Sequence, residues 1–261
     1  MTFLAIARMA FFQQAFYRFE LVFNALRAVV FVVVISAVWR AVYQSRPALA
    51  GFTLEQLVLY TCTAAMLVLL YEVYVEREIG DRLRSGNLAL QLLKPVNYFL
   101  YGLAEGTGTL AYTAAFSVLP TVAVLALLFD FPPVEPGGLA LALAMVALGF
   151  GLFFAFCHIT ALTTFFTVEV WGVEYMRMVL VRFLAGGIVP LALFPEALRA
   201  FVLWLPFPYM IYFPTLALTG TLDPALAGRV LALQAGWLAL LLGANALYWK
   251  AIVRQVTIHG G

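Results

Sequence analysis

Six apolar stretches, each long enough to cross a lipid bilayer, constrain this chain more than any other feature of its sequence. They cover about residues 21–43, 54–74, 98–129, 139–168, 175–194 and 229–252. A transmembrane helix needs about 20 predominantly apolar residues. Only 11% of the 261 residues are charged, against about 25% in a soluble domain, so the bilayer is the expected solvent. We therefore predict an all-α integral membrane protein with six transmembrane helices in one domain, residues 1–261.

The basic residues predict which side of the membrane each loop faces, because Lys and Arg gather on the cytoplasmic side of membrane proteins. If the N-terminus is cytoplasmic, four of the 15 basic residues fall outside, namely Arg40, Arg46, Arg199 and Arg229. All the others lie at cytoplasmic ends or loops. We therefore expect both termini in the cytoplasm.

Residues 3–18, before the first stretch, have a loosely amphipathic pattern. Arg8, Gln14 and Arg18 lie on its polar side, and phenylalanines supply much of the other side. This pattern is typical of a helix lying in the membrane interface.

The segment 76–95, between the second and third stretches, is the most charged part of the chain. Ser85-Gly86-Asn87 is typical of the end of one helix and the cap of the next. Ile79 and Leu83 give the first short helix an apolar face, and Leu88 begins a second. We predict a helix–turn–helix elbow on the cytoplasmic surface. An ordinary solvated loop is the alternative, but the two faces and the caps favour a docking surface.

The segment 194–224 contains too many prolines for one membrane span and too many aromatic residues for a solvated loop. We predict a pair of short helices that enter the outer leaflet and return, which requires cover by protein or a water-filled cavity. The alternative is an interfacial aromatic belt formed by Trp204, Tyr209 and Tyr212.

The motifs of common catalytic and nucleotide sites are missing. No glycine-rich loop leads into Lys-Ser or Lys-Thr, so the chain does not bind ATP by that mechanism. No zinc-protease motif, nucleophile elbow or cysteine pair with metal spacing is present. Cys62 and Cys157 are expected to be buried small apolar side chains. We expect no catalytic residue, metal or cofactor in this chain, and no nucleic-acid partner because the basic residues are spread out.

A few ionisable residues lie at or near membrane depth, where such groups are functional candidates. Glu105 and Glu169 either face a polar interior path or are solvated at the interface, or they pair with Arg177 and Arg182. His158 is either a proton relay or a neutral, hydrogen-bonded packing residue.

Two segments together resemble the type-2 ABC exporter permeases, specifically a bacterial branch with six spans. The first is the run from Glu78 to Leu88 with Leu92-Leu93-Lys94-Pro95-Val96. The second comprises Ile188-Val189-Pro190, Phe194 to Arg199, Leu205-Pro206-Phe207 and Tyr212-Phe213-Pro214. The glycine-ended tail, residues 254–261, is also similar, and the resemblance covers essentially the whole chain. Asp81 and Asn87 make the first segment more polar than is usual in the family.

This resemblance implies one membrane half of an ATP-driven exporter that moves a hydrophobic or amphiphilic substrate out of the cell. A second permease chain, identical or a sister, would pair with it in the bacterial plasma (inner) membrane. Two separate ATPase subunits would carry the ATP and Mg. The chain itself would not be an enzyme.

The resemblance also implies roles for particular residues. The elbow would couple the chain to the ATPase through Ile79, Arg82, Leu83, Arg84, Gly86 and Leu88. The translocation path or outer gate would involve Glu105, Glu169, Pro195, Pro206, Phe207, Tyr212 and Pro214. The alternative function is an ion-gradient-driven secondary transporter or channel that uses Glu105, His158 and Glu169 without an ATPase. A lipid-modifying membrane enzyme is disfavoured by the missing nucleophile and metal motifs.

Overall fold

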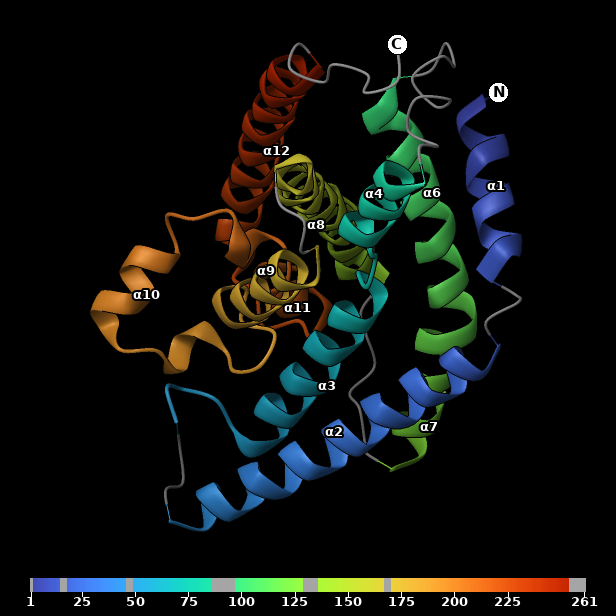
Figure 1. The fold of residues 1–261 in the computed structure, drawn as a ribbon. Helices are drawn as coiled ribbons and strands as arrows, with labels where there is room; N and C mark the ends of the chain where they lie inside the picture. Colours follow the sequence, from blue (N-terminus) through green and yellow to red (C-terminus); the bar gives the residue numbers. More distant parts are fainter. Residues whose placement is uncertain are drawn as a thin grey trace, which may run out of the picture.

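The fold is a bundle of helices of very different lengths (Figure 1). A computed structural model describes residues 2–14, 18–45, 49–85, 97–128, 136–166 and 170–253. Within these ranges nearly every residue is helical and no strand forms, which confirms the all-α class.

Five helical segments are long and apolar enough to cross a membrane. They are Phe23–Gln44 in α2 (Arg18–Ser45), Leu54–Arg84 in α3 (Leu54–Leu70) and α4 (Val75–Arg84), Tyr98–Leu127 in α6 (Tyr98–Thr113) and α7 (Leu119–Leu128), Gly138–Phe165 from α8 (Pro136–Leu162), and Pro224–Ile252 in α12 (Pro224–Val253). They correspond to the first four and the sixth of the predicted spans, so the protein is a multi-pass membrane protein.

The predicted fifth span, residues 175–194, differs from the rest. Its helix, α9 (Val170–Leu184), has 15 residues, which is about 22 Å of helix against about 30 Å of hydrocarbon. The helix stops before Gly186, whose φ of +74° lies in the left-handed region that glycine tolerates. An apolar run alone does not reveal such an early end, so the sequence placed the helix too late and made it too long.

Short helices follow α9 as the prolines predicted. They are η3 (Leu191–Leu193), α10 (Glu196–Val202), η4 (Phe207–Tyr209) and α11 (Tyr212–Leu218). The stretches Glu196–Val202 and Phe207–Leu218 are bent by 73° from each other and count as one further broken span or a re-entrant loop. We call residues 186–218 the broken segment.

The long third span is also interrupted, as its length suggested. A π-helical turn, η1 (Ala114–Val118), separates α6 from α7. Pro120 follows directly, and it has no N–H to offer the carbonyl group four residues earlier.

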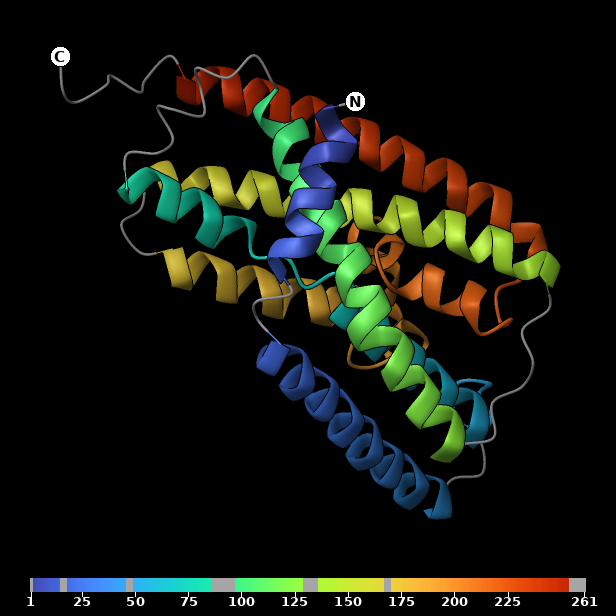
Figure 2. The same cartoon turned by 90° about the vertical axis from the view of Figure 1, so that its right-hand side faces the viewer.

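The helix ends alternate between two ends of the molecule. The last turns of α4, α8 and α12 and the first turn of α9 lie at one end, on the left in Figure 2. The last turns of α2 and α7 and the first turns of α8 and α12 lie at the other. This arrangement fits the predicted topology, in which the charged elbow and the last turn of α12 share one side. The cytoplasmic identity of that side stays a prediction.

The central helix is α8, which contacts α4, α9, α11 and α12. Its buried positions include the small residues Ala142, Ala155, Cys157 and Ala161. Small residues let membrane helices approach closely, so this composition explains how α8 packs against so many neighbours. The expected burial of Cys62 and Cys157 is confirmed, and both are free thiols.

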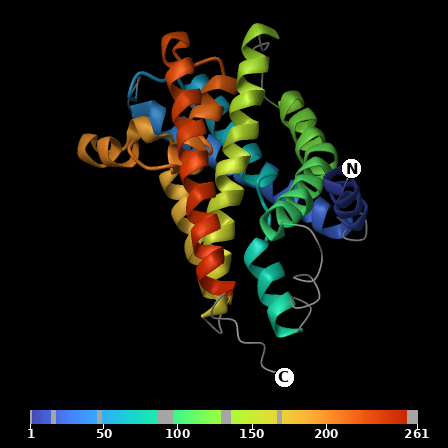
Figure 3. The ribbon, with the colours of Figure 1, turned by 90° about the horizontal axis from the view of Figure 1, so that it is seen from above.

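The helix predicted over residues 3–18 forms as α1 (Thr2–Gln14), and Arg18 already belongs to α2. It crosses α6 and runs crosswise to α8 and α12 (Figures 2 and 3). Arg8 is exposed, as expected, but Gln14 donates a hydrogen bond to Thr109 Oγ1 at 3.3 Å instead of facing water. Phe11 packs against Tyr112. This polar and aromatic contact with α6 was not predicted.

A glycine makes the close contact between α1 and α6 possible. A Cβ atom added to Gly108 would collide with the carbonyl oxygen of Ala7 and lie 2.9 Å from the Cβ of Ala10. No such obstacle exists at Gly236 in α12, where nothing lies within 4 Å. The two glycines therefore allow a matched test.

We expect Gly108→Ala to destabilise the protein by roughly 1–3 kcal/mol, because α1 must shift away from α6. Gly236→Ala should leave stability unchanged or raise it by up to about 1 kcal/mol, since alanine is the better helix former. Thermal unfolding of both purified variants in a neutral detergent measures the difference. Equal melting temperatures would contradict the close packing.

Candidate functional site

The first helix of the predicted elbow forms as α4, Val75–Arg84. Glu76 and Glu78 lie in its first turn and Arg82 and Arg84 in its last, which suits the helix dipole. Its C-cap is Ser85, at the predicted turn. The rest of the elbow, including Gly86 and Leu88, lies outside the described residues, so their predicted coupling role stays a prediction.

One face of α4 packs into the angle between α8 and α9. Ile79 is buried there, and Leu83 packs against the same core. A Cβ atom on Gly80 would lie 2.6 Å from Cγ2 of Val170, so only glycine permits this approach to α9. Two of the predicted coupling residues, Ile79 and Leu83, therefore help to hold α4 in place, and their contact with an ATPase stays a prediction.

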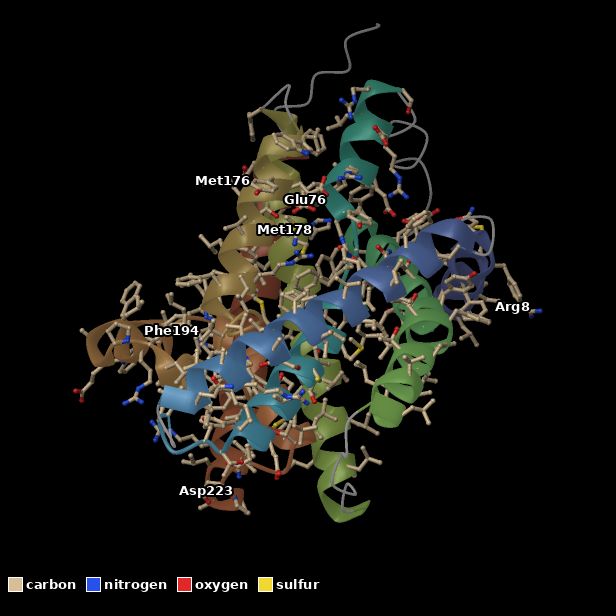
Figure 4. The ribbon with its side chains drawn as sticks, turned by 90° about the horizontal axis from the view of Figure 1, so that it is seen from below. Arg8, Glu76, Met176, Met178, Phe194 and Asp223 are labelled. Atoms are coloured by element: carbon tan, nitrogen blue, oxygen red, sulfur yellow. The ribbon has the colours of Figure 1, made fainter. Side chains whose placement is uncertain are left out.

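A fully buried ion pair joins the start of α4 to α9. The carboxylate of Glu76 is 0% exposed and accepts hydrogen bonds from Arg177 Nε and, at 3.3 Å, from Arg177 Nη2. The hydroxyl of Thr160 in α8 donates to the same carboxylate at 2.7 Å. Three helices thus meet at one carboxylate, which lies between α4 and α9 (Figure 4).

A second ion pair, at the edge of the first, joins the same two helices. Arg77 Nε donates to Glu174 Oε2 at 2.7 Å, and the guanidinium group lies 4.8 Å from the centre of the Tyr74 ring. For Glu105 and Glu169 the sequence left pairing with Arg177 or Arg182 open, but in the structure Arg177 pairs with Glu76 and Arg182 contacts Glu72. Glu169, the other acid of that prediction, lies outside the described residues.

A third ion pair joins the end of α4 to α6. Arg82 Nη2 donates to both carboxylate oxygens of Glu105, at 2.9 and 2.7 Å. The side chain of Arg82 is only 17% exposed. The family resemblance implies separate roles for these two residues, Arg82 at the ATPase and Glu105 in the path, whereas the structure brings them together.

The exposed side of α4 carries a different kind of pair. Arg84 donates to Asp81 at 2.9 Å, but the side chains are 62% and 73% exposed. Exposed pairs of this kind contribute little stability, about 0–1 kcal/mol. The charges of Asp81 and Arg84 are available to a partner, whereas those of Glu76 and Arg82 are not.

A fourth group of charges lies where α3 ends. Arg27 of α2 donates to both oxygens of Glu72, at 3.1 and 2.8 Å, and Arg182 of α9 approaches Glu72 at 3.4 Å. Together with the pairs above, this group forms what we call the charged layer: Arg27, Glu72, Glu76, Arg77, Arg82, Glu105, Glu174, Arg177 and Arg182. It ties α2, α3, α4, α6 and α9 together.

The predicted gate residues lie in the broken segment. Pro195 is the N-cap of α10, Pro206 that of η4, and Tyr212 and Pro214 lie in the first turn of α11. Phe207 is buried, and its ring packs edge-on against Phe156 of α8 with centroids 5.2 Å apart. Their action as a gate stays a prediction.

Side chains that the sequence did not single out hold this segment. The Tyr60 hydroxyl of α3 donates to the carbonyl oxygen of Gly186 at 2.8 Å. Gln234 of α12, which is fully buried, donates to the carbonyl oxygens of Tyr209 at 2.8 Å and Met145 at 2.9 Å. The sequence signal that could have identified Gln234 is a glutamine inside an apolar helix, because a buried amide group needs a hydrogen-bond partner.

The buried histidine is paired. His158 Nδ1 lies 2.8 Å from Oδ1 of Asn245, whose amide nitrogen donates to the carbonyl oxygens of Ala155 and Leu241. This geometry agrees with the hydrogen-bonded packing interpretation. Within the described ranges, no group of three or more acidic, histidine or cysteine residues is arranged to hold a metal ion.

One comparison with known proteins identifies a relationship. A family model described as "ABC-2 family transporter protein" matches residues 28–260. No curated protein and no solved structure matches the chain.

The burial of Glu76 predicts a large effect of its removal. We expect Glu76→Gln to destabilise the protein by about 3–5 kcal/mol, because the Arg177 charge stays buried without a counter-charge. Asp81→Asn, in the exposed pair, should cost less than about 1 kcal/mol. Thermal unfolding in neutral detergent compares them.

The double variant Glu76→Leu/Arg177→Met supplies the control for this prediction. It should recover most of the lost stability, because an apolar pair replaces both charges. Similar melting temperatures for Glu76→Gln and Asp81→Asn would contradict the structural role of the pair.

Proposed function

The chain belongs to the ABC-2 transporter family, and we propose that it is the permease of an ATP-driven exporter in which separate ATPase subunits act on α4. The family makes the chain the membrane subunit of an ABC transport system. The direction of transport, outward, and a hydrophobic or amphiphilic cargo are part of the proposal.

The observation that carries this proposal is the contrast between the two sides of α4. Asp81 and Arg84 are exposed on one side, while Glu76 and Arg82 on the other form ion pairs with α9 and α6. A partner can therefore bind the exposed side without breaking the internal pairs. A displacement of α4 carries its neighbours with it, because separating a buried pair costs about 3–5 kcal/mol.

Helix α9 extends this linkage toward the broken segment. It starts beside α4, where Glu174 and Arg177 form their ion pairs, and ends just before Gly186. The Gly186 carbonyl is held by Tyr60, and the following residues contain the predicted gate. We propose that two positions of α4 correspond to two arrangements of this segment, and that the ATPase favours one or the other according to its nucleotide.

The assembly we propose contains two ATPase subunits, which hold ATP and Mg, and a second permease chain, identical or a sister. Its place is the bacterial plasma membrane, with both termini in the cytoplasm. Of these partners, the family supports the ATPase subunits and the membrane.

The alternative, an ion-gradient-driven transporter or channel, receives less support. Of its three proposed ion-binding residues, Glu105 is paired bidentately with Arg82, and His158 is bonded to Asn245. A carboxylate already neutralised by a guanidinium group is a poor carrier for a cation.

Capture of the ATPase tests the docking surface. The chain is co-expressed with candidate ABC ATPases from its source genome, and the amount of ATPase that copurifies is measured. We expect the charge exchange Asp81→Arg/Arg84→Asp to reduce capture roughly tenfold, because like charges then face the partner. The exchange keeps a pair within α4, so a loss reports on the partner and not on helix stability.

Arg40→Glu, at the opposite end of the bundle, is the control and should capture the ATPase as wild type does. Undiminished capture by the exchanged chain would show that the ATPase binds elsewhere. Failure of the wild-type chain to capture any ATPase would favour the ion-gradient alternative.

Arg82 should behave differently from the exposed residues. We expect Arg82→Gln to capture the ATPase normally but to lose substrate-stimulated ATP hydrolysis, because α4 is no longer tied to Glu105 of α6. Capture and hydrolysis are measured on the same preparations. A loss of capture equal to that of the Asp81/Arg84 exchange would mean that Arg82 touches the ATPase directly.

A further inference from the structure

A cleft lies beside the charged layer, between the end of α3, α8 and α9. It is narrow, and its volume of about 430 Å³ includes space that is open to the surroundings. Its apolar and aromatic lining comprises Val68, Tyr71, Val73, Tyr74, Phe153, Met178, Val181 and Ile211. Glu72, Glu174, Arg177 and Arg182 also line it, so one cleft combines an apolar surface with a charged one. Met178, which lines the cleft, belongs to α9 and is labelled in Figure 4.

The charges around this cleft do not cancel. Glu72 is paired with Arg27 at 2.8 Å, Glu174 with Arg77 at 2.7 Å, and Glu76 with Arg177. Each carboxylate therefore has its own close guanidinium group. The lining itself holds two acids and two arginines, and Arg182 becomes the additional cation when the ion-pair partners Arg27, Arg77 and Glu76 are included.

Arg182 is only weakly satisfied. In the part of the chain that the structure describes, its one ion pair is a 3.4 Å contact with Glu72, which already accepts two shorter hydrogen bonds from Arg27. A guanidinium group has five N–H donors. The side chain is 31% exposed, so its remaining donors are accessible from the cleft.

The position of Arg182 makes this surplus significant. It lies about 18 Å along α9 from Val170, at 1.5 Å per residue, and level with Glu72. A charged group at such depth in a membrane protein faces the protein interior or a polar cavity and marks a pathway. Arginine binds phosphate with two parallel hydrogen bonds, which makes an organic phosphate the best-fitting ligand.

We propose that this cleft binds an amphiphile with an anionic phosphate head, and that Arg182 pairs with the head group while the apolar lining holds the alkyl chain. The apolar lining distinguishes this ligand from free phosphate, since each methylene group buried there raises affinity roughly fourfold. Ile211 belongs to the broken segment, so the cleft reaches from the charged layer to the predicted gate. That the amphiphile is the cargo rests on the proposed export function.

Lipid binding to the purified full-length chain tests the site. The chain in neutral detergent is titrated with dioleoyl phosphatidic acid or dioleoyl phosphatidylcholine, and bound lipid is counted by native mass spectrometry. The two lipids share their acyl chains and differ in head-group charge. We expect the wild-type chain to prefer phosphatidic acid roughly tenfold or more, the effect of a charged hydrogen bond.

Three variants assign the preference to Arg182. Arg182→Gln should abolish it, and Arg182→Lys should keep part of it because the charge remains. Arg40→Gln removes the same charge from the far end of α2 and should retain the full preference. A preference that survives in Arg182→Gln, or that disappears in Arg40→Gln, overturns the proposal.

Two further measurements test whether the lipid occupies the cleft and whether its alkyl chains contribute to binding. Met178→Trp fills the cleft with Arg182 intact and should weaken phosphatidic acid binding, whereas unchanged binding would place the lipid elsewhere. Inorganic phosphate at the same concentration should compete poorly with phosphatidic acid for the site. Competition equal to that of the lipid would overturn the proposal that the ligand is an amphiphile.

ATPase capture, measured on the same wild-type preparations, separates this inference from the proposed function. Normal capture without an Arg182-dependent preference overturns the inference alone. A preference without capture overturns the proposed function alone.

Discussion

The carboxylate of Glu76 is the constraint on which the arrangement of this protein depends. An isolated carboxylate cannot be removed from water without a cost of several kcal/mol, so its burial requires Arg177 and Thr160 at bonding distance. These three residues come from α4, α9 and α8. Because apolar residues of similar volume stabilise a core about as well, the ion pair adds little net stability. What it specifies is position, since α4 satisfies the carboxylate only when seated between α8 and α9.

The early end of α9 brings a second requirement, which concerns the backbone instead of a charged side chain. Its backbone polar groups must be satisfied inside a membrane. A helix that ends at Leu184 leaves carbonyl groups and non-helical backbone at membrane depth, where protein must cover them. Tyr60 and Gln234 supply that cover by donating to carbonyl groups of the broken segment. Helix α9 thus has close ion pairs in its first half, whereas its end has the longer 3.4 Å contact of Arg182 with Glu72 and neutral hydrogen bonds to the residues that follow. The neutral bonds are worth about 1 kcal/mol each and are the easier to exchange.

How much the sequence predicted depends on the range over which each interaction acts. The first four spans and the sixth, the C-cap of α4 at Ser85 and the proline-broken segment are local properties, and the structure agrees with them, whereas the predicted fifth span was wrong in length and position. The partners of the charges are not local. Glu76 and Arg177 are 101 residues apart, and Arg82 meets Glu105 only because of how α4 and α6 are rotated about their axes. Hydropathy gives neither rotation nor tilt, so the sequence left several surroundings open for these acids and did not predict the pairs Glu76–Arg177 and Arg82–Glu105.

The strength of the ion pairs increases from the surface of α4 toward its buried side, and this gradient suits a helix that exchanges contacts with a partner. Asp81 and Arg84 are well solvated, so a partner can replace their mutual contact at little cost. Glu76 and Arg82 face surroundings in which a broken pair is expensive, so their contacts persist while α4 moves. Force applied at the exposed pair therefore moves the helix as a unit. If the order were reversed, with weak pairs inside, the same force would detach α4 and leave α9 where it was.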